Sequence, residues 1–258
     1  MRSAELALHV EEHGDGDVLL LIQGLGQGSW VWRGQVPVFG QRWRTVVFDL
    51  RGTGRSPAPP EPYGIDDLAR DAADILAGRP AHVVGFSMGG YIALTLALAE
   101  PELVRSLVLV GTGAGGPGRV PRPAHVQRAF TEAIGIPLAD YGPVTMPYTF
   151  APGWSEKHPE RFEEILAARI EHPTQYSTLD VHAQACYAYY AAGPPVEQID
   201  VQALVVHGVE DLIVPVENGR MLAARLPHSR LVELPDRGHN LALEDPETFN
   251  RLVLEFLT

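Results

Sequence analysis

Short apolar runs alternate with longer stretches of helical periodicity along this chain, and this alternation constrains its fold more than any other feature. Continuous apolar runs of this length are typical of strands buried on both faces of a parallel sheet. They occur at residues 18–23, 45–50, 81–86, 106–110, 203–207 and 230–234. Helical patterns occur at residues 32–39, 65–76, 88–99, 216–226 and 246–257. Residues 6–12 alternate and predict an exposed edge strand. The sequence therefore predicts an α/β fold with a mostly parallel sheet and helices on both faces.

The alternation is interrupted between residues 112 and 198, where no buried strand pattern occurs. Two helical patterns fall in this interval, at residues 162–171 and 178–192. The sequence thus predicts a core domain formed by residues 1–111 and 199–258. Residues 112–198 are expected to be a helical unit inserted into that core.

Charge and composition exclude several classes of partner. The formal net charge is −12, and a chain this acidic repels phosphate backbones, so we expect no nucleic acid partner. Neither the first ten residues nor any other stretch has the apolar length of a signal peptide or a membrane span, so we expect a cytoplasmic protein without a membrane partner. We expect a monomer or a homodimer, although the sequence does not determine which. Cys186 is the only cysteine and lies in an apolar helical stretch, so we expect it to be a buried small side chain.

The segment Gly85-Phe86-Ser87-Met88-Gly89 fits the G-x-S-x-G pattern of a nucleophile elbow. It directly follows one buried strand pattern and directly precedes a helical pattern. A sharp turn from strand to helix strains the backbone of the central residue, and flanking glycines avoid a clash there. The serine hydroxyl then lies beside a helix N-terminus, which favours negative charge. The sequence predicts Ser87 as a nucleophile.

A serine hydroxyl needs a base, and nucleophile elbows of this type are followed in the chain by an acid and then a histidine. Asp211 follows the strand pattern 203–207, and His239 follows the pattern 230–234. Both lie in loops at strand carboxyl ends, where open α/β sheets place their sites. The sequence predicts a catalytic triad of Ser87, Asp211 and His239.

Other residues could take these roles. Glu210 neighbours Asp211 and is an alternative acid. His82 and His207 lie inside strand patterns and are expected to be core or sheet-face histidines, and Asp236 is expected to be a turn residue.

An oxyanion hole is expected beside the nucleophile. One donor would be the backbone N–H of Met88, the residue after the nucleophile, and the second would come from the loop after the first buried strand. That loop is Gln23-Gly24-Leu25-Gly26, so the second donor would be the N–H of Leu25. Gly24 and Gly26 would let the backbone approach the substrate.

Two further motifs are interpreted as coincidences. Residues 9–13, His-Val-Glu-Glu-His, fit a metalloprotease pattern, but that pattern requires a helix and this segment alternates like a strand. Residues 113–118 fit a dinucleotide fingerprint, but a proline-rich stretch follows instead of a helix. We therefore expect no metal and no cofactor.

Together these motifs resemble the α/β-hydrolase superfamily, in the branch that holds 3-oxoadipate enol-lactonases, small carboxylesterases, C–C bond hydrolases and cofactor-free perhydrolases. The resemblance extends over nearly the whole chain. It implies that the inserted unit is a helical cap over the pocket and that Asp49, in the segment 48–56, belongs to a structural turn. Two departures are a glutamine, Gln23, where the family usually has histidine, and an N-terminus short by about one strand. A serine at position 87 argues against the branches that use a carboxylate nucleophile.

The resulting hypothesis is a serine hydrolase that cleaves a small carboxylic ester or lactone through an acyl-enzyme on Ser87, with a general esterase preferred over an enol-lactonase. Aromatic and methionine side chains of the insertion, among them Trp154, could line the pocket or form the insertion's own core. C–C bond hydrolysis or perhydrolysis with the same triad remains an alternative. A small-molecule receptor derived from a hydrolase is an alternative of another class.

Overall fold

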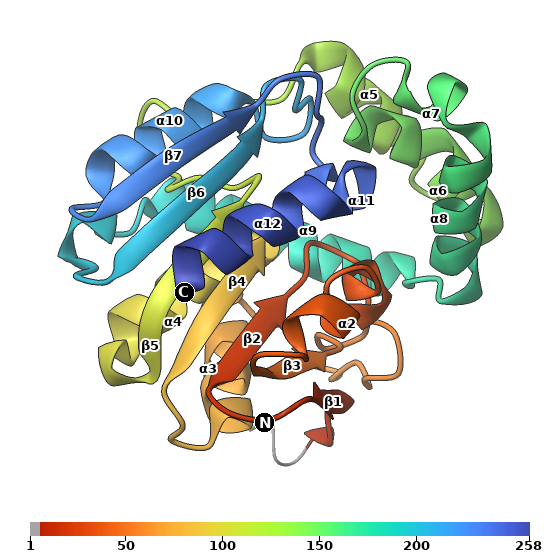
Figure 1. The fold of residues 1–258 in the computed structure, drawn as a ribbon. Coiled ribbons are helices and arrows are strands. Elements are labelled where there is room, and N and C mark those ends of the chain that lie inside the picture. Colours follow the sequence, from red (N-terminus) through yellow and green to blue (C-terminus); the bar gives the residue numbers. More distant parts are fainter. Residues whose placement is uncertain (1–5) are drawn as a thin grey trace.

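The computed structural model describes residues 6–258, which form a seven-stranded sheet with helices around it (Figure 1). Residues 1–5, part of the segment on which the expected lack of a signal peptide rests, lie outside the described residues. The strands are β1 (Val10–His13), β2 (Val18–Ile22), β3 (Arg44–Phe48), β4 (Ala81–Phe86), β5 (Val104–Val110), β6 (Gln202–Gly208) and β7 (Ser229–Leu234). Their order is β1-β3-β2-β4-β5-β6-β7, and only β1 is antiparallel to its neighbour. The mostly parallel sheet is as predicted.

Helices cover both faces of this sheet, also as predicted. The helices α3 (Ile65–Leu76), α4 (Met88–Ala99) and α10 (Val216–Arg225) pack on one face, and α2 (Val36–Phe39) and α12 (Pro246–Leu257) pack on the other. Successive strand residues alternate between the two cores, so that Leu20 of β2 faces α3 and α4 while Leu19 and Leu21 face α12. All three side chains are fully buried, which explains why these strands are continuously apolar in sequence.

Two predicted elements differ from the structure. Residues 32–39 do not form one helix, because Pro37 lacks an N–H and its ring would clash with the preceding turn. The chain instead forms a 3-10 turn η1 (Ser29–Trp32) followed by the short α2. The edge strand exists but is β1, Val10–His13, and residues 6–9 precede it without strand structure.

Between β5 and β6 the chain forms helices and no strand. They are α5 (Ala124–Glu132), α6 (Leu138–Thr145), η3 (Met146–Thr149), α7 (Trp154–Lys157), α8 (Pro159–Glu171), α9 (Tyr176–Ala192) and η4 (Val196–Gln198). Figure 1 shows α5 to α8 as a group beside the end of the sheet. Helix α9 returns to the core and packs in the same apolar cluster as α3 and α4. We call residues 112–198 the inserted segment, and its separate folding as a domain stays a prediction. Cys186 of α9 is buried, and burial raises the pKa of its thiol to about 12.

Two further short elements complete the described chain. They are η2 (Pro101–Leu103), before β5, and α11 (Leu241–Glu244), between β7 and α12. None of the helices in residues 6–258 has the length and apolarity needed to cross a membrane.

The passage from β4 to α4 is tightly packed against β2. A Cβ atom added to Gly89 would lie 2.1 Å from the carbonyl oxygen of Ile22, and one added to Gly85 would lie 2.5 Å from the carbonyl oxygen of Gly89. Backbone atoms cannot give way as a flexible side chain can. Glycine at these positions therefore lets α4 approach β2 and β4 closely enough to begin directly after Ser87.

Gly89→Ala is expected to lower the free energy of unfolding by about 1–3 kcal/mol, although alanine is the better helix former, because the new methyl group overlaps the Ile22 carbonyl. Urea denaturation followed by circular dichroism measures the change. The matched control is Gly64→Ala, since an added Cβ there meets no atom within 4 Å. Equal urea midpoints for the two variants would contradict this account of the crossing.

Candidate active site

Ser87 occupies the turn between β4 and α4 with φ 55° and ψ −117°, a conformation that L-residues rarely adopt. Its N–H donates to the carbonyl oxygen of Val110 at 2.8 Å, and its own carbonyl accepts the hydroxyl of Thr112 at 2.9 Å. Neighbouring strand β5 thus holds the strained residue from both sides. The side chain is half-buried and stands at the N-terminal end of α4.

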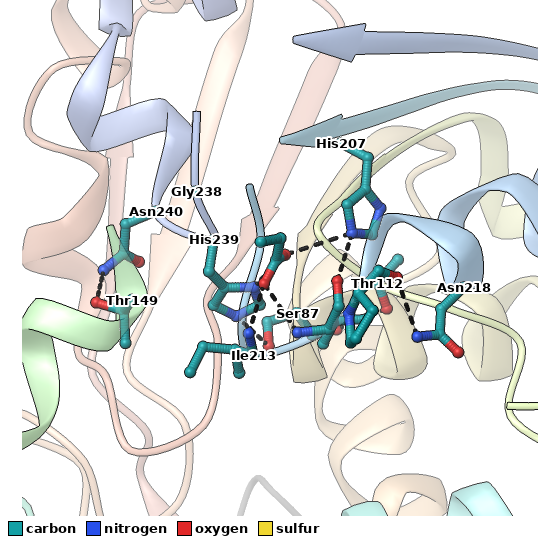
Figure 2. Close-up of polar contacts among 12 residues, drawn as sticks. Ser87, Thr112, Thr149, His207, Ile213, Asn218, Gly238, His239 and Asn240 are labelled. Atoms are coloured by element: carbon teal, nitrogen blue, oxygen red, sulfur yellow. Dashed lines mark hydrogen bonds and ion pairs between the residues drawn. The ribbon is translucent and has the colours of Figure 1, made fainter. Parts of the chain in front are cut away.

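The structure brings the three predicted residues together. His239 Nε2 lies 3.0 Å from Ser87 Oγ, and His239 Nδ1 lies 2.7 Å from Asp211 Oδ2 (Figure 2). His239 is only 5 % exposed, and its ring packs against that of Phe86 with the centroids 4.9 Å apart. Because Nδ1 faces a carboxylate, the ring carries its proton there, and Nε2 is free to accept the serine proton.

Asp211 is fixed by several donors at once. Its Oδ1 accepts the backbone N–H groups of Ile213 and Val214, both at 2.8 Å, and its Oδ2 lies 3.3 Å from His207 Nε2 as well as facing His239. Burial alone would raise the pKa of this carboxyl. The charges and hydrogen bonds of His239 and His207 outweigh burial and hold the pKa below its ordinary value. Asp211 is therefore an ionised acceptor for His239 at neutral pH.

The other candidate residues, all within residues 6–258, form no hydrogen bond with Ser87. Glu210 is exposed, and Asp236 is an exposed turn residue with φ 56°. His82 is half-buried on β4 and contacts Ser106 Oγ at 2.8 Å. His207 is buried on β6, as expected of a core histidine, but its Nε2 also contacts the Val214 carbonyl at 2.8 Å, so it supports the Asp211 loop. That second contact had no sequence signal, because it depends on how the loop folds back onto β6.

The loop after β2 lies directly against Ser87. A Cβ atom on Gly24 would be 3.2 Å from Ser87 Cβ, so glycine is needed for this approach. In the part of the chain that the structure describes, the backbone hydrogen bonds outside helices and strands include none donated by Leu25 or Met88. The predicted part of these two N–H groups in an oxyanion hole stays a prediction.

The backbone of Gly26 is hydrogen-bonded to the inserted segment. Its N–H donates to His182 Nδ1 at 3.2 Å, and its carbonyl accepts the Thr174 hydroxyl at 2.8 Å and the Arg169 guanidinium. A Cβ atom on Gly26 would overlap Leu179 at 2.3 Å. Its predicted part in substrate binding stays a prediction, and its polar backbone groups already have partners.

Trp154 begins α7 and is 6 % exposed. Its ring stacks on Phe150 with the centroids 4.7 Å apart, within an apolar cluster that also includes Ile165. Contact with a substrate at Trp154 therefore stays a prediction. A surface cavity of about 300 Å³ beside Trp30 and Arg33 has none of the triad among its lining residues.

Gln23, Asp49 and the segment 9–13 all have structural contacts in the fold. Gln23 Nε2 donates to the Phe48 carbonyl at 2.7 Å, so this glutamine ties the loop after β2 to the end of β3. Asp49 accepts the backbone N–H groups of Ser29 at 2.7 Å and Arg55 at 2.9 Å, which makes it a turn residue. His9 and His13 both contact Glu11, which lies in strand β1 and not in a helix.

Glu244, at the end of α11, is a residue that the sequence analysis missed. It is 9 % exposed, and its Oε1 accepts the N–H groups of Gly238 at 2.9 Å and Ala151 at 3.2 Å. Burial raises its pKa to about 7, although both amide donors and Arg237 act in the opposite direction. The available signal was a carboxylate directly after the apolar stretch 241–243.

Glu244 should make stability depend on pH. Its pKa is raised on folding from about 4.5 to about 7, so the unfolded chain ionises first and stability is lost as the pH rises through this interval. The loss is up to about 3 kcal/mol, since one pKa unit corresponds to about 1.4 kcal/mol. Glu244→Gln removes this loss. Urea denaturation of both proteins from pH 5 to pH 8 should show the variant gaining relative to wild type, and a constant difference would contradict the assignment.

Comparisons with known proteins agree with this geometry. Residues 17–246 match the family described as alpha/beta hydrolase fold. A Caulobacter segnis protein named "Putative carbamate hydrolase RutD" is 34 % identical over 256 residues, which cover 93 % of this chain and 91 % of that protein. The enol-lactonase of Burkholderia xenovorans LB400 superposes with a TM-score of 0.81 at 28 % identity, over 97 % of this chain and 96 % of that one. A thermophilic esterase of Thermogutta terrifontis gives a TM-score of 0.80 at 25 % identity, over 97 % and 92 %.

Three observations indicate the same family. They are the strand-to-helix turn at Ser87, the mostly parallel sheet and the family match over residues 17–246. The chain belongs to the α/β-hydrolase family and is a hydrolase.

Proposed function

We propose that this hydrolase cleaves a small carboxylic ester or lactone through an acyl-enzyme on Ser87. One observation carries the proposal: Ser87 Oγ, His239 and Asp211 form a continuous hydrogen-bonded chain with contacts of 3.0 and 2.7 Å. A serine within hydrogen-bond reach of a base, which is itself oriented by a carboxylate, is the arrangement that nucleophilic catalysis requires.

The first half of the reaction forms the acyl-enzyme. His239 Nε2 takes the proton of Ser87 Oγ as that oxygen bonds to the substrate carbonyl carbon. Asp211 stays ionised and stabilises the imidazolium that results. When the tetrahedral intermediate collapses, Nε2 gives its proton to the leaving oxygen, and the alcohol departs.

The negative charge on the former carbonyl oxygen needs donors that are already in place. The N–H groups of Met88 and Leu25 fill this role in the proposal, and the N-terminus of α4 adds a favourable field. Removing one such donor typically lowers turnover by about a hundredfold to a thousandfold.

The second half regenerates the enzyme. A water molecule gives its proton to His239 Nε2 and attacks the acyl carbon, and Ser87 Oγ leaves with the proton returned by the imidazole. For a lactone, the leaving oxygen stays attached to the product as a hydroxyl group. The solved relatives named above include both an esterase and an enol-lactonase, which supports oxygen esters as the substrate class.

Ser87→Ala is expected to lower kcat on p-nitrophenyl esters by at least about a thousandfold, because within residues 6–258 only the Ser87 hydroxyl contacts His239. Hydrolysis of the series from acetate to dodecanoate by both proteins measures the effect, and the chain-length optimum gives the size of the acyl site. The matched control is Ser177→Ala, at an exposed position of α9. More than a few per cent of wild-type turnover in Ser87→Ala would overturn the covalent mechanism.

Carbamates are a second candidate substrate class, favoured by the Caulobacter segnis relative and by others of the same name. The same attack by Ser87 applies to a carbonyl that bears nitrogen. Ethyl acetate and ethyl carbamate share one leaving group, so each rate of ethanol release can be divided by the uncatalysed rate. A larger acceleration for ethyl acetate is expected from the ester proposal, and a larger one for ethyl carbamate would replace it.

A further inference from the structure

A single carboxylate oxygen joins the loop of the candidate base to the inserted segment. Glu244 Oε1 accepts the N–H of Gly238, the residue directly before His239, at 2.9 Å. The same oxygen accepts the N–H of Ala151, two residues beyond the end of η3, at 3.2 Å. These two amides are 87 residues apart in the sequence, so the chain itself does not bring them together.

The two backbones meet here without room to spare. A Cβ atom on Gly238 would lie 2.4 Å from both Ala151 N and the Phe150 carbonyl carbon. On the other side of His239, the Asn240 N–H donates to the Thr149 carbonyl at 2.8 Å, and Asn240 Nδ2 donates to Thr149 Oγ1 at 2.7 Å. Figure 2 shows this Asn240–Thr149 contact beside His239. His239 is thus flanked by two residues that are docked on residues 149–151.

Apolar packing continues the same contact. Leu243, next to Glu244, belongs to the cluster formed by Phe150, Ala151 and Trp154. The guanidinium of Arg161 in α8 donates to the Leu243 carbonyl from Nε at 3.2 Å and from Nη2 at 3.1 Å. The short helix α11 therefore contacts the inserted segment through Leu243 as well as through the Glu244 side chain.

A buried carboxyl group at this position lowers the stability of the fold, so packing alone does not explain why Glu244 is there. Glu244 Oε2 is buried and has no hydrogen-bond partner within residues 6–258. An unsatisfied buried polar atom typically costs about 1–3 kcal/mol. Either protonation state of the carboxyl leaves Oε1 able to accept both amides, so the link does not depend on the charge.

We propose that Glu244 is a positioning residue for His239, which fixes the backbone before the imidazole against residues 149–151 and so sets the reach of Nε2 to Ser87 Oγ. This inference rests on the proposed function, because it assumes that His239 acts as the base. The base is then placed by the inserted segment as well as by the sheet. A displacement of about 1 Å at a reacting group can cost about a hundredfold in rate.

The first test compares Glu244→Ala, which removes the acceptor, with Glu244→Gln, which keeps it at Oε1. Glu244→Ala is expected to lower kcat on the best p-nitrophenyl ester by roughly tenfold to a hundredfold with little change in KM, because it moves the base and leaves the acyl site intact. Glu244→Gln is expected to keep kcat close to wild type. The control pair is Glu247→Ala and Glu247→Gln, at an exposed position in the first turn of α12.

The second test reads the position of His239 without any substrate. The proton between His239 Nδ1 and Asp211 Oδ2, which lie 2.7 Å apart, should give a downfield proton NMR signal in wild type. The signal should broaden or shift in Glu244→Ala and persist in Glu244→Gln and in the Glu247 variants. If wild type shows no ester turnover, the proposed function fails, and this signal still decides whether Glu244 positions the ring.

Two results would overturn the inference. One is a folded Glu244→Ala with wild-type kcat and an unchanged downfield signal. The other is an equal loss in Glu244→Ala and Glu244→Gln, which would mean that the charge matters and the acceptor does not. If Glu244→Ala does not fold, Glu244→Asp replaces it, because its shorter side chain cannot reach both amides, and the same two outcomes apply.

Discussion

The hydrogen bonds that hold Ser87 at φ 55° are the constraint on which the rest of this molecule depends. A single residue separates β4 from α4, so the turn must be sharp, and the strain is held by Val110 and Thr112 of the neighbouring β5 strand and its loop. The parallel register of β4 and β5 places those partners at the carboxyl ends of the strands. The sheet therefore fixes the position of Ser87, the candidate nucleophile, through contacts that involve neither Asp211 nor His239.

The candidate base is fixed by different means. His239 lies on the loop after β7, two strands away from β5 in the sheet, yet its Nε2 lies 3.0 Å from Ser87 Oγ. Asp211 fixes one side of the imidazole, and contacts with residues 149–151 fix the backbone on both sides of it. The loop after β2 depends on the inserted segment in the same way, because His182 and Thr174 bind Gly26. The inserted segment thus supports both the candidate base and the loop after β2.

Sequence reasoning reached the parts of this structure that are encoded in local patterns. Buried parallel strands are continuously apolar, so β2 to β6 could be located within a few residues, and the turn at Ser87 could be recognised from the glycines around it. The failure at residues 32–39 is also local, because Pro37 was passed over inside an apparent helix. Proximity of Ser87, Asp211 and His239 followed from their common position at strand carboxyl ends, while their catalytic role stays a prediction.

The contacts that sequence reasoning missed depend on tertiary packing. Nothing in the spacing of Glu244, Ala151 and Gly238 indicates that one oxygen accepts two amides from distant segments. His207 and His182 were equally hidden, since a buried histidine in a strand or helix pattern is first of all a core residue. Periodicity located two of the inserted helices, α8 and α9, to within a few residues, but α5, α6 and α7 were not predicted. Which residues of the inserted segment meet the core could not be predicted either.

Labelling with a serine-directed fluorophosphonate tests the central claim most directly, because it reports the reactivity of Ser87 without requiring the natural substrate. Peptide mapping by mass spectrometry after labelling should find about one adduct per chain, on the peptide that contains Ser87, and His239→Ala should slow its formation strongly. Ester turnover without an adduct, or an adduct on a different residue, would contradict the claim that Ser87 is the nucleophile.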